Sequence, residues 1–311
     1  PIVIVYFVQN AESGKKCNLA LYNFILIKYN ITITFFFFFL KMKKILALIM
    51  ALCMIFALAG CGNKSDSDLD YVKEKGKLVV GVTVFEPMDY QDADGKWVGF
   101  DADMANAFAE SLGVEAEFQI IDWDSKAMEL ESKTIDVVWN GMTLTDEVKG
   151  AMDCSNAYFN NAQVVIVKSD KAQQYQTVDS IKELNFAVEN GSAGAQQLDD
   201  LGIKYTPVAD QATALTEVTA GTSDAAVIDF LMAVSMVGEG TDYDKLTHTV
   251  SLNKEEYGVG FRKGSDLVDE LNKFFKESYA DGTMKKIADN YKIAEYLIEQ
   301  NMIRTVECRL I

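Results

Sequence analysis

From residue 78 onward, short apolar runs alternate along the chain with segments in which apolar residues recur every three or four positions. The run Leu78–Val82 is apolar throughout, which is typical of a strand buried on both faces. In the segment 100–112 the apolar residues share one helical face, and we expect Asp101 to cap this helix and Gly113 to end it. This alternation predicts an α/β fold.

The same signals predict further elements along the rest of the chain. Strands are expected at 115–121, 135–139, 186–188, 225–228 and 257–261, and helices at 125–132, 180–184, 210–220, 266–279 and 283–291. For the helix at 210–220, Asp210 is the expected cap and Gly221 the expected end. The β-α-β-α-β order implies parallel pairing with right-handed crossovers. Because the pattern restarts near residue 180, we expect two α/β lobes.

A charged start, a short apolar core and small residues precede a cysteine in the first fifth of the chain. Met42 and two lysines are followed by the apolar run Ile45–Ala59 and by the sequence LAGC, which ends at Cys61. This order is typical of a bacterial secretory signal. The cysteine indicates a lipobox, with a signal peptide at 42–60, lipidation at Cys61 and a lipidated tether at 61–70. The competing interpretation is a membrane-spanning helix, for which the run is shorter than the roughly 20 residues required.

Residues 1–41 have a different composition from the rest of the chain. They begin with Pro1 and are rich in Phe, Ile, Asn, Lys and Tyr, the residues that A/T-rich codons encode. We expect this stretch to be translated upstream sequence rather than a folded element. The alternative is a membrane-spanning segment at 21–40, in which Lys28 would cost about 2.5–3.5 kcal/mol inside the bilayer.

The charge of the chain argues against several classes of partner. There are 46 Asp and Glu residues against 29 Lys and Arg, for a net charge of −17. The segment before Cys61 contributes six basic residues and one acidic residue, so the part that follows is more acidic still. Such a surface argues against nucleic acid and against adhesion to anionic lipids. We therefore expect contact with the membrane through the lipid anchor only.

Histidine and cysteine, which supply many metal and nucleophilic sites, are scarce. His248 is the single histidine and lies in a segment that reads as an ordinary strand, and Cys154 and Cys308 are the cysteines that follow Cys61. These residues allow no His/Cys metal cluster, and no Gly-x-Ser-x-Gly pattern occurs. We expect no cofactor and no Ser-His-Asp catalytic site. A small buried thiol at Cys154 is favoured over a disulfide with Cys308.

Small, polar and aromatic residues follow the expected strands. In open α/β sheets, ligands bind beyond the carboxyl ends of the strands. Those positions hold Thr83 to Met88, Asp122 and Trp123, Asn140 to Thr143, Asn190 to Gly194, and Asp229. This set suits a small polar ligand held between aromatic rings.

Seven short motifs are distributed along the same part of the chain. They are GVTVFEPM at 81–88, GFDADMA at 99–105, NGMTLTDE at 140–147, MDCSNAY at 152–158, VENGSAG at 188–194, SDAAVID at 223–229 and YGVGFRKGS at 257–265. In this order and spacing they resemble the amino-acid-type solute-binding proteins of ATP-driven importers, the family 3 periplasmic binding proteins. The resemblance covers roughly 71–298.

The resemblance implies a two-lobe type II periplasmic-binding-protein fold, in which each lobe is a mostly parallel sheet flanked by helices. Lobe 1 would comprise 71–159 and 253–298, and lobe 2 would comprise 160–252, followed by a tail at 299–311. Two crossing strands, near 158–162 and 252–257, would join the lobes. The cleft between them would close on the ligand by hinge bending.

The resemblance also implies ligand contacts at particular residues. Phe85 and Trp123 would sandwich the ligand, and Trp123 is the better cation–π partner, worth about 0.5–2 kcal/mol. Gly141 and Thr143 match the positions that hold the ligand's ammonium and carboxylate, and Asp229 matches the acid that pairs with an α-ammonium. In the alternative interpretations, Phe85 or Trp123 belongs to the core and Asp229 caps the helix that follows it.

Further candidates come from the second lobe and from the same loops. Ser192 and Ala193 match a loop whose amides, at a helix N-terminus, bind a carboxylate. The remaining candidate ligand-binding residues are Glu86, Asn140 and Met142. Thr145 is expected to cap the helix that begins at Asp146 rather than to contact the ligand.

One position departs from the family pattern. Where the family has an arginine that holds the ligand's α-carboxylate, this chain has Val148, and the neighbouring Lys149 would point about 100° away on a helix. Either backbone amides around Thr143 and Ser192 bind the carboxylate, or the ligand has none. Glu86, Glu189 and Asp229 place negative charge near the expected cleft, so we expect a small polar ligand with a cationic group, either an amino acid or a related amine.

These observations lead to a binding protein that delivers its solute to an ABC permease and its ATPase. We expect a monomer, anchored by lipid on the extracytoplasmic face of a bacterial cell membrane, in a Gram-positive envelope. The alternatives are a dehydratase-like enzyme on the same fold, with Glu86 or Glu189 as acid or base, and a ligand-sensing domain.

Overall fold

Residues 67–300 are described by a computed structural model. The expected signal peptide, the lipidation site Cys61, most of the expected tether and residues 301–311 lie outside the described residues. Within the described range, no helix combines the length and the apolar character that crossing a membrane requires.

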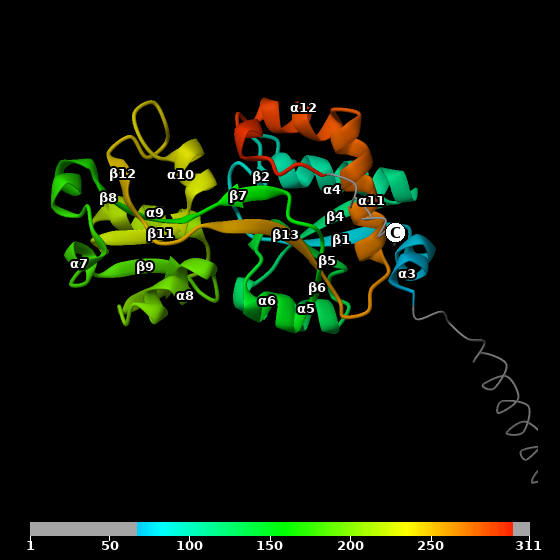
Figure 1. The fold of residues 1–311 in the computed structure, drawn as a ribbon, viewed down its shortest axis with the longest axis horizontal. Coiled ribbons are helices and arrows are strands. Elements are labelled where there is room, and N and C mark those ends of the chain that lie inside the picture. Colours follow the sequence, from blue (N-terminus) through cyan, green and yellow to red (C-terminus); the bar gives the residue numbers. More distant parts are fainter. Residues whose placement is uncertain (1–66, 301–311) are drawn as a thin grey trace, which may run out of the picture. The chain divides into compact units, whose positions relative to one another are not determined.

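The first sheet forms the centre of one lobe, here called lobe 1 (Figure 1). Its strands are β1 (Lys77–Val82), β4 (Glu115–Ile120), β5 (Val137–Thr143), β6 (Asp153–Cys154), β7 (Phe159–Asn161) and β13 (Glu255–Phe261). The order is β4-β1-β5-β13-β6, with β7 also paired to β13. Strand β1 runs parallel to β4 and β5, whereas β13 is antiparallel to its neighbours.

The second sheet forms the centre of the other lobe, called lobe 2. Its strands are β8 (Gln163–Lys168), β9 (Phe186–Glu189), β10 (Tyr205–Val208), β11 (Ala225–Asp229) and β12 (Leu246–Ser251), in the order β10-β9-β11-β8-β12. Strands β10, β9 and β11 are parallel, and β8 is antiparallel to β11 and β12. Each sheet is thus parallel on one side and antiparallel where the chain enters from the other lobe.

Two adjacent segments of the chain link the sheets. Strand β7 ends at Asn161 and β8 begins at Gln163, while β12 ends at Ser251 and β13 begins at Glu255. The links lie side by side, because Glu255 pairs with Asn161 across the β7–β13 ladder (Figure 1). The lobe limits expected from the sequence stay a prediction.

Helices cover both faces of each sheet. One face of the lobe 1 sheet is covered by α4 (Phe100–Leu112), α11 (Leu267–Ala280) and α12 (Thr283–Asn290) (Figure 1). The other face is covered by the 3₁₀ turn η1 (Trp123–Ser125), α5 (Lys126–Glu131) and α6 (Asp146–Ala151). Helix α3 (Asp68–Lys75) lies near β1. Lobe 2 contains α7 (Val178–Ile181), α8 (Ala193–Asp200), α9 (Gln211–Ala220) and α10 (Phe230–Met236). The smaller elements are β2 (Tyr90–Gln91), β3 (Trp97–Val98), η2 (Ser169–Gln174) and η3 (Ala294–Tyr296).

The alternation of strand residues decides which helix each face packs against. Ala226 and Ile228 belong to the same hydrophobic cluster as residues of α9 and α10, whereas Ala225 and Val227 pack with residues of α7 and α8. Because successive side chains of a strand point to opposite faces, a wholly apolar strand requires cover on both.

The N-cap residues expected from the sequence are confirmed at two helices and wrong at one. Asp210 accepts a hydrogen bond from Thr213 N, and Thr145 accepts one from Val148 N, as expected of N-caps. Asp101 does not cap α4, because the N-cap is Gly99 and Asp101 is a fully buried residue of the first turn. Its carboxylate faces the interior and accepts hydrogen bonds there.

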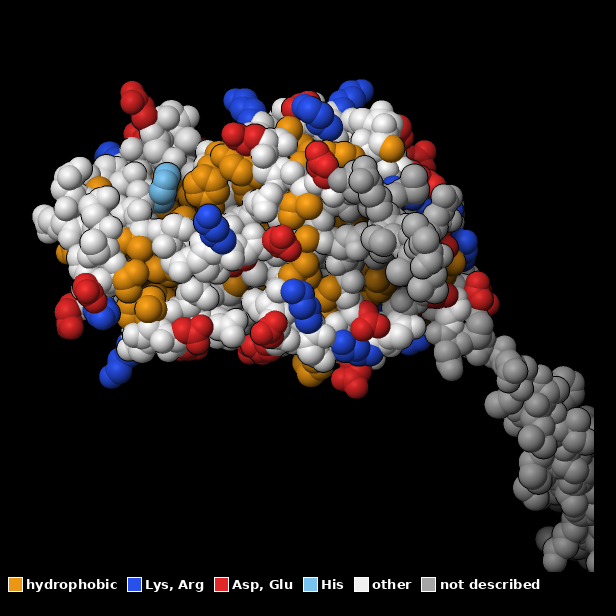
Figure 2. Space-filling model, in the orientation of Figure 1, with side chains coloured by type: hydrophobic (Ala, Val, Ile, Leu, Met, Phe, Trp, Pro, Cys, Tyr) orange, Lys and Arg blue, Asp and Glu red, His pale blue; other side chains and the backbone are white. Residues whose placement is uncertain are grey.

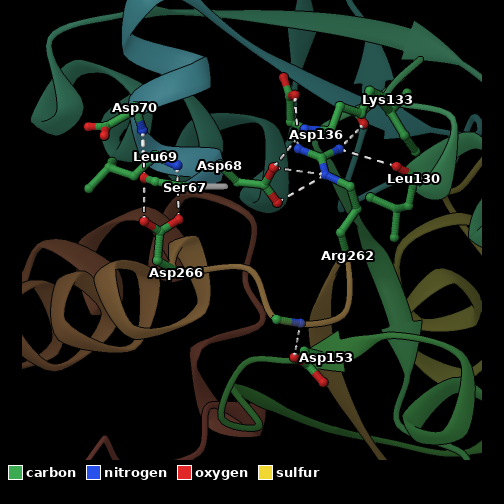
Figure 3. A network of polar contacts seen from close by, with 12 residues as sticks. Ser67, Asp68, Leu69, Asp70, Leu130, Lys133, Asp136, Asp153, Arg262 and Asp266 are labelled. Atoms are coloured by element: carbon green, nitrogen blue, oxygen red, sulfur yellow. Dashed lines mark hydrogen bonds and ion pairs between the residues drawn. The ribbon is translucent and has the colours of Figure 1, made fainter. Parts of the chain in front are cut away.

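A network around Arg262 ties the start of the described chain to lobe 1 (Figure 3). Arg262, which follows β13, contacts Asp68 of α3 at 2.9 Å and Asp136 at 3.5 Å. Its Nη1 also donates to the carbonyl oxygens of Leu130 and Ile135. Asp68 and Asp136 are buried, and the Arg262 side chain is 9% exposed, so α3 is held by ionic groups that are mostly shielded from solvent rather than by surface pairs.

Candidate ligand-binding site

A cavity of about 460 Å³ lies between the two lobes, at the carboxyl ends of β1, β5, β9 and β11. The structure brings nine of the ten candidate ligand-binding residues to its wall. They are Phe85, Trp123, Asn140, Gly141, Met142, Thr143, Ser192, Ala193 and Asp229. We call this cavity the pocket.

Glu86 is the candidate that the pocket does not include. It is half-buried, and its Oε1 accepts a hydrogen bond of 3.1 Å from Ser235 Oγ of α10. Burial raises the pKa of the Glu86 carboxyl. The Glu86–Ser235 hydrogen bond therefore joins the two lobes, and the Glu86 side chain does not line the pocket.

Phe85 and Gly141 meet at the lobe 1 wall. Phe85 is 2% exposed and packs edge-on against Tyr257, with ring centroids 6.2 Å apart. A Cβ at position 141 would lie 2.4 Å from Phe85 Cε1, and Gly141 has a φ of +54°. Glycine is therefore required there both by the close approach and by the left-handed backbone. Phe85 serves the core and the pocket wall at once.

Polar groups at this wall are already engaged. The Gly141 N–H donates to Asp101 Oδ2 at 2.6 Å, and the Thr143 hydroxyl donates to Glu255 Oε1 at 2.9 Å. The Asn140 amide bonds to Thr83 and Asp89 through both its oxygen and its nitrogen. The Gly141 amide, one of the donors considered for a carboxylate, is thus used by the protein itself.

Asp229 lies in a dense cluster of donors at the lobe 2 wall. Its carboxylate accepts hydrogen bonds from Gln163 Nε2 and Tyr257 Oη, each at 2.9 Å, and also from Asn161 and Gln211. Its side chain makes no capping bond to α10, which removes the alternative that it only caps this helix. Burial, followed by the nearby Glu255 charge, raises its pKa well above the usual range.

The sequence reasoning missed the residues that surround Asp229. Glu255 Oε1 accepts hydrogen bonds from Asn161 at 2.7 Å and from Gln163 at 2.8 Å, so the two segments that link the lobes share one polar cluster. A usable signal existed, because polar residues with buried side chains in strands are uncommon unless they bond to one another. Asn161 and Gln163 are both buried.

Lys126 is the cationic residue among those that line the described pocket, and the sequence reasoning passed over it. Its Nζ donates to the carbonyl oxygens of Trp123 and Gly191, both at 3.1 Å, and lies 4.9 Å from the Trp123 ring centroid. Burial lowers its pKa, while acidic neighbours, Glu189 first among them, act in the opposite direction. The Trp123 ring therefore already has a cation beside it.

Acidic residues dominate the charged part of the pocket wall. Six carboxylates line it, from Asp124, Glu147, Glu189, Asp199, Asp200 and Asp229. Glu189 is 2% exposed, and burial raises its pKa to about 8. Its Oε1 has no hydrogen-bond partner. A ligand that bears positive charge or several N–H donors fits such a wall better than an anion.

The lobes touch on more than one side of the pocket. The Gly191 loop approaches Asp124 so closely that a Cβ at position 191 would lie 2.5 Å from Asp124 Oδ1. Phe230 of α10 packs edge-on against Tyr296, with centroids 5.6 Å apart. Together with the Lys126–Gly191 and Ser235–Glu86 bonds, these contacts describe lobes that are closed over the pocket.

Val148 occupies the position at which the family pattern has arginine. It lines the pocket and is 8% exposed, packed in a cluster with Trp123, Met142 and Met152. Lys149 is exposed and does not line the pocket. The wall formed by α6 is therefore apolar where a guanidinium would otherwise project.

The remaining residues singled out from the sequence lie elsewhere. His248 is an exposed residue of β12 that packs against Phe230, and it is visible at the surface of lobe 2 (Figure 2). Cys154 is half-buried and carries a free thiol, and Cys308 lies outside the described residues. No group of three or more residues suited to bind a metal occurs between residues 67 and 300.

Comparisons with known proteins agree with this architecture. Residues 78–294 match the family model described as bacterial extracellular solute-binding proteins, family 3. The chain is 32% identical to the L-cystine-binding protein TcyJ of Escherichia coli (strain K12), over 72% of this chain and 85% of that protein. It is 30% identical to the arginine-binding extracellular protein ArtP of Bacillus subtilis (strain 168), over 71% of this chain and 88% of that protein.

Among solved structures, the P235GK mutant of ArgBP from T. maritima is similar with a TM-score of 0.68 and 30% identity, over 72% of this chain and 99% of that chain. The α/β sheets with flanking helices expected from the sequence are thus confirmed as the type II periplasmic-binding-protein fold, and each sheet is mixed rather than mostly parallel. The chain belongs to the family 3 bacterial extracellular solute-binding proteins.

Proposed function

We propose that this protein captures a cationic amino acid or a related amine between its two lobes and delivers it to an ABC permease and its ATPase. The observation that carries the proposal is the pocket wall, which has six carboxylates and one lysine. Relatives named for binding cystine and arginine support an amino-acid-type ligand. The proposed ligand contacts are the nine candidate residues on the wall together with Lys126 and Glu189.

The α-ammonium of the ligand is proposed to lie at Asp229 and Thr143. Asp229 is fixed by four donors and therefore has a defined direction, and the Thr143 hydroxyl oxygen retains lone pairs after donating to Glu255. A ligand carboxylate would be held near Lys126 and near the amides at the start of α8, which Ser192 caps.

The protein is proposed to act as a carrier rather than an enzyme. A dehydratase-like enzyme needs a positioned acid and a positioned base. Glu189 could supply an acid, but the Asp229 carboxylate is held by four side-chain donors and, in this proposal, faces the ligand's α-ammonium, so it is not free to act as a base. Recovery of each bound compound unchanged after prolonged incubation, checked by mass spectrometry, is the expected result.

The signal peptide and the lipid at Cys61 are proposed to place the protein on the outer face of the cell membrane, as a monomer, in a Gram-positive envelope. The family supports an extracytoplasmic location. Replacement of Cys61 by serine is expected to release the protein from the membrane fraction into the medium. Retention in the membrane fraction would argue against lipid anchoring.

A thermal-shift screen of the purified protein against amino acids and amines tests the ligand class. A ligand that binds the folded state adds about 2.7 kcal/mol at a concentration one hundred times its Kd. L-arginine, L-lysine and their decarboxylated amines are expected to raise the melting temperature. A screen in which only acidic ligands such as glutamate do so would reject the proposal.

A further inference from the structure

Glu189 is a buried residue with one carboxyl oxygen that lacks a hydrogen-bond partner. It ends β9, is 2% exposed and lines the pocket. Its Oε1 has no hydrogen-bond partner in the described structure. A buried oxygen without a partner is rare in folded proteins, because its lost hydration is not compensated. The free oxygen thus identifies a place where a donor is missing.

The groups around Glu189 do not supply that donor. Thr83, which follows β1, and Gln211 of α9 hydrogen-bond to the carboxyl, and Asp210 adds a second negative charge nearby. Lys126 is the nearby cation, but its Nζ already donates to two carbonyl oxygens, and it forms no ion pair with Glu189 in residues 67–300.

The chemistry of the missing donor follows from these neighbours. A ligand carboxylate at this point would meet Glu189 and Asp210, and an apolar group would leave the oxygen unsatisfied. A cationic nitrogen satisfies the oxygen and offsets the charge of both acids, and hydrogen bonds to charged groups are the stronger ones. Glu189 and Asp229 lie on adjacent parallel strands, so one ligand can reach both.

We propose that Glu189 recognises a positively charged side chain of the ligand. Its Oε1 accepts a hydrogen bond from a second cationic nitrogen, while Asp229 faces the α-ammonium. The substrate class is therefore that of solutes with two cationic nitrogens, such as amino acids with a guanidino or amino side chain. This inference rests on the proposed function and adds Glu189 as the residue that selects among amino acids and amines.

The test compares L-arginine with L-citrulline, which has nearly the same shape but a neutral side chain. Calorimetric Kd values are measured for the unaltered protein, for Glu189→Gln and for Glu183→Gln, in which the same change is made at an exposed residue of lobe 2 outside the pocket. The unaltered protein is expected to prefer arginine. Glu189→Gln should reduce that preference about tenfold or more, as expected for loss of one charge-assisted hydrogen bond, and Glu183→Gln should preserve it.

Two further measurements keep the outcomes distinct. Melting temperatures without ligand show that Glu189→Gln is folded, and the arginine Kd of the unaltered protein should fall as the pH rises towards 8 while the citrulline Kd changes less. An unchanged preference in Glu189→Gln, or an equal loss for both ligands, would overturn the role of Glu189 and leave the proposed function intact. If no amino acid or amine binds the unaltered protein, both proposals fail.

Discussion

Lys126 Nζ donates a hydrogen bond of 3.1 Å to the carbonyl oxygen of Gly191, and this contact joins α5 of lobe 1 to the loop before α8 of lobe 2. The same ammonium bonds to Trp123 O and lies beside the Trp123 ring on the pocket wall. The Lys126 side chain therefore both bonds to the opposite lobe and forms part of the pocket wall.

Replacing Lys126 by methionine should weaken ligand binding. The change keeps the length of the side chain but removes the bond to Gly191, and a hydrogen bond to a charged group contributes about 1.5–3 kcal/mol. We expect the Kd for L-arginine to rise roughly tenfold, mainly through faster dissociation in stopped-flow experiments. Lys149→Met, at an exposed residue outside the pocket, is the matched control. Equal Kd values in the two variants would show that the contact does not hold the lobes together.

Replacing Val148 by arginine tests where the ligand's carboxylate lies. Val148 faces the pocket from α6, so a guanidinium placed there could bind a carboxylate through two hydrogen bonds. We expect tighter binding of L-arginine but not of agmatine, which has the same side chain and no carboxylate. No change in the ratio of the two Kd values would argue that the carboxylate is bound elsewhere.

Replacing Gly141 by alanine should damage both the fold and the pocket. The new Cβ would lie 2.4 Å from Phe85 Cε1, at a φ of +54°, so the Phe85 ring would have to move. We expect a loss of about 1–3 kcal/mol, as for other overpacked sites, measured by urea denaturation, together with weaker arginine binding. Gly150→Ala is the control, because nothing lies within 4 Å of a Cβ there. A neutral effect of Gly141→Ala would contradict the close contact with Phe85.

The fold could be predicted from the sequence because its main signals are local. The apolar run at β1 and the caps Asp210 and Thr145 depend on residues within one or two turns, and all three are found. Asp101 shows the limit of this reasoning. It has the chemistry and position of a cap, but tertiary contacts with Gly141 and Tyr158 direct its carboxylate inward.

The candidate site could be predicted in part, for the same reason. Residues at the ends of strands gather at one edge of a sheet, and this placed nine candidates on the pocket wall. Glu86 follows a strand end too, but its carboxylate bonds to Ser235, which is 149 positions away in the chain. The contact of Lys126 with Gly191 depends on how the two lobes pack against each other, and no local sequence pattern predicts that packing.

Replacing Arg262 by methionine should destabilise the protein more than any surface ion-pair change. Asp68 and Asp136 are buried, and loss of Arg262 would leave their charges without this partner. Breaking a buried pair by removing one member costs about 3–5 kcal/mol. Lys285→Met, which breaks an exposed pair with Asp289, should cost about 1 kcal/mol or less. Urea denaturation of both variants measures the difference, and similar losses would show that the Arg262 network contributes no more than a surface pair.

The ligand-free protein should lose stability as the pH rises, and Glu189 should account for part of the loss. Burial raises the pKa of Glu189 in the folded protein to about 8, from the ordinary value of 4.5. Between these values the folded state binds more protons than the unfolded state, so the free energy of unfolding falls with increasing pH. The contribution of Glu189 is complete below about pH 4.5 and is lost as the pH approaches and passes 8.

Asp229, Asp89 and Asp101 also have raised pKa values and act in the same direction, so the contribution of Glu189 must be taken as a difference. Glu189→Gln cannot ionise and should flatten the pH dependence of the free energy of unfolding between pH 5 and 8, measured by urea denaturation at several pH values. The control Glu183→Gln, at an exposed residue outside the pocket, should keep the slope of the unaltered protein. Saturating L-arginine should reduce the loss at pH 8, because a bound cation stabilises the ionised carboxylate. Parallel pH profiles for Glu189→Gln and the unaltered protein would show that Glu189 is ionised in the ligand-free pocket.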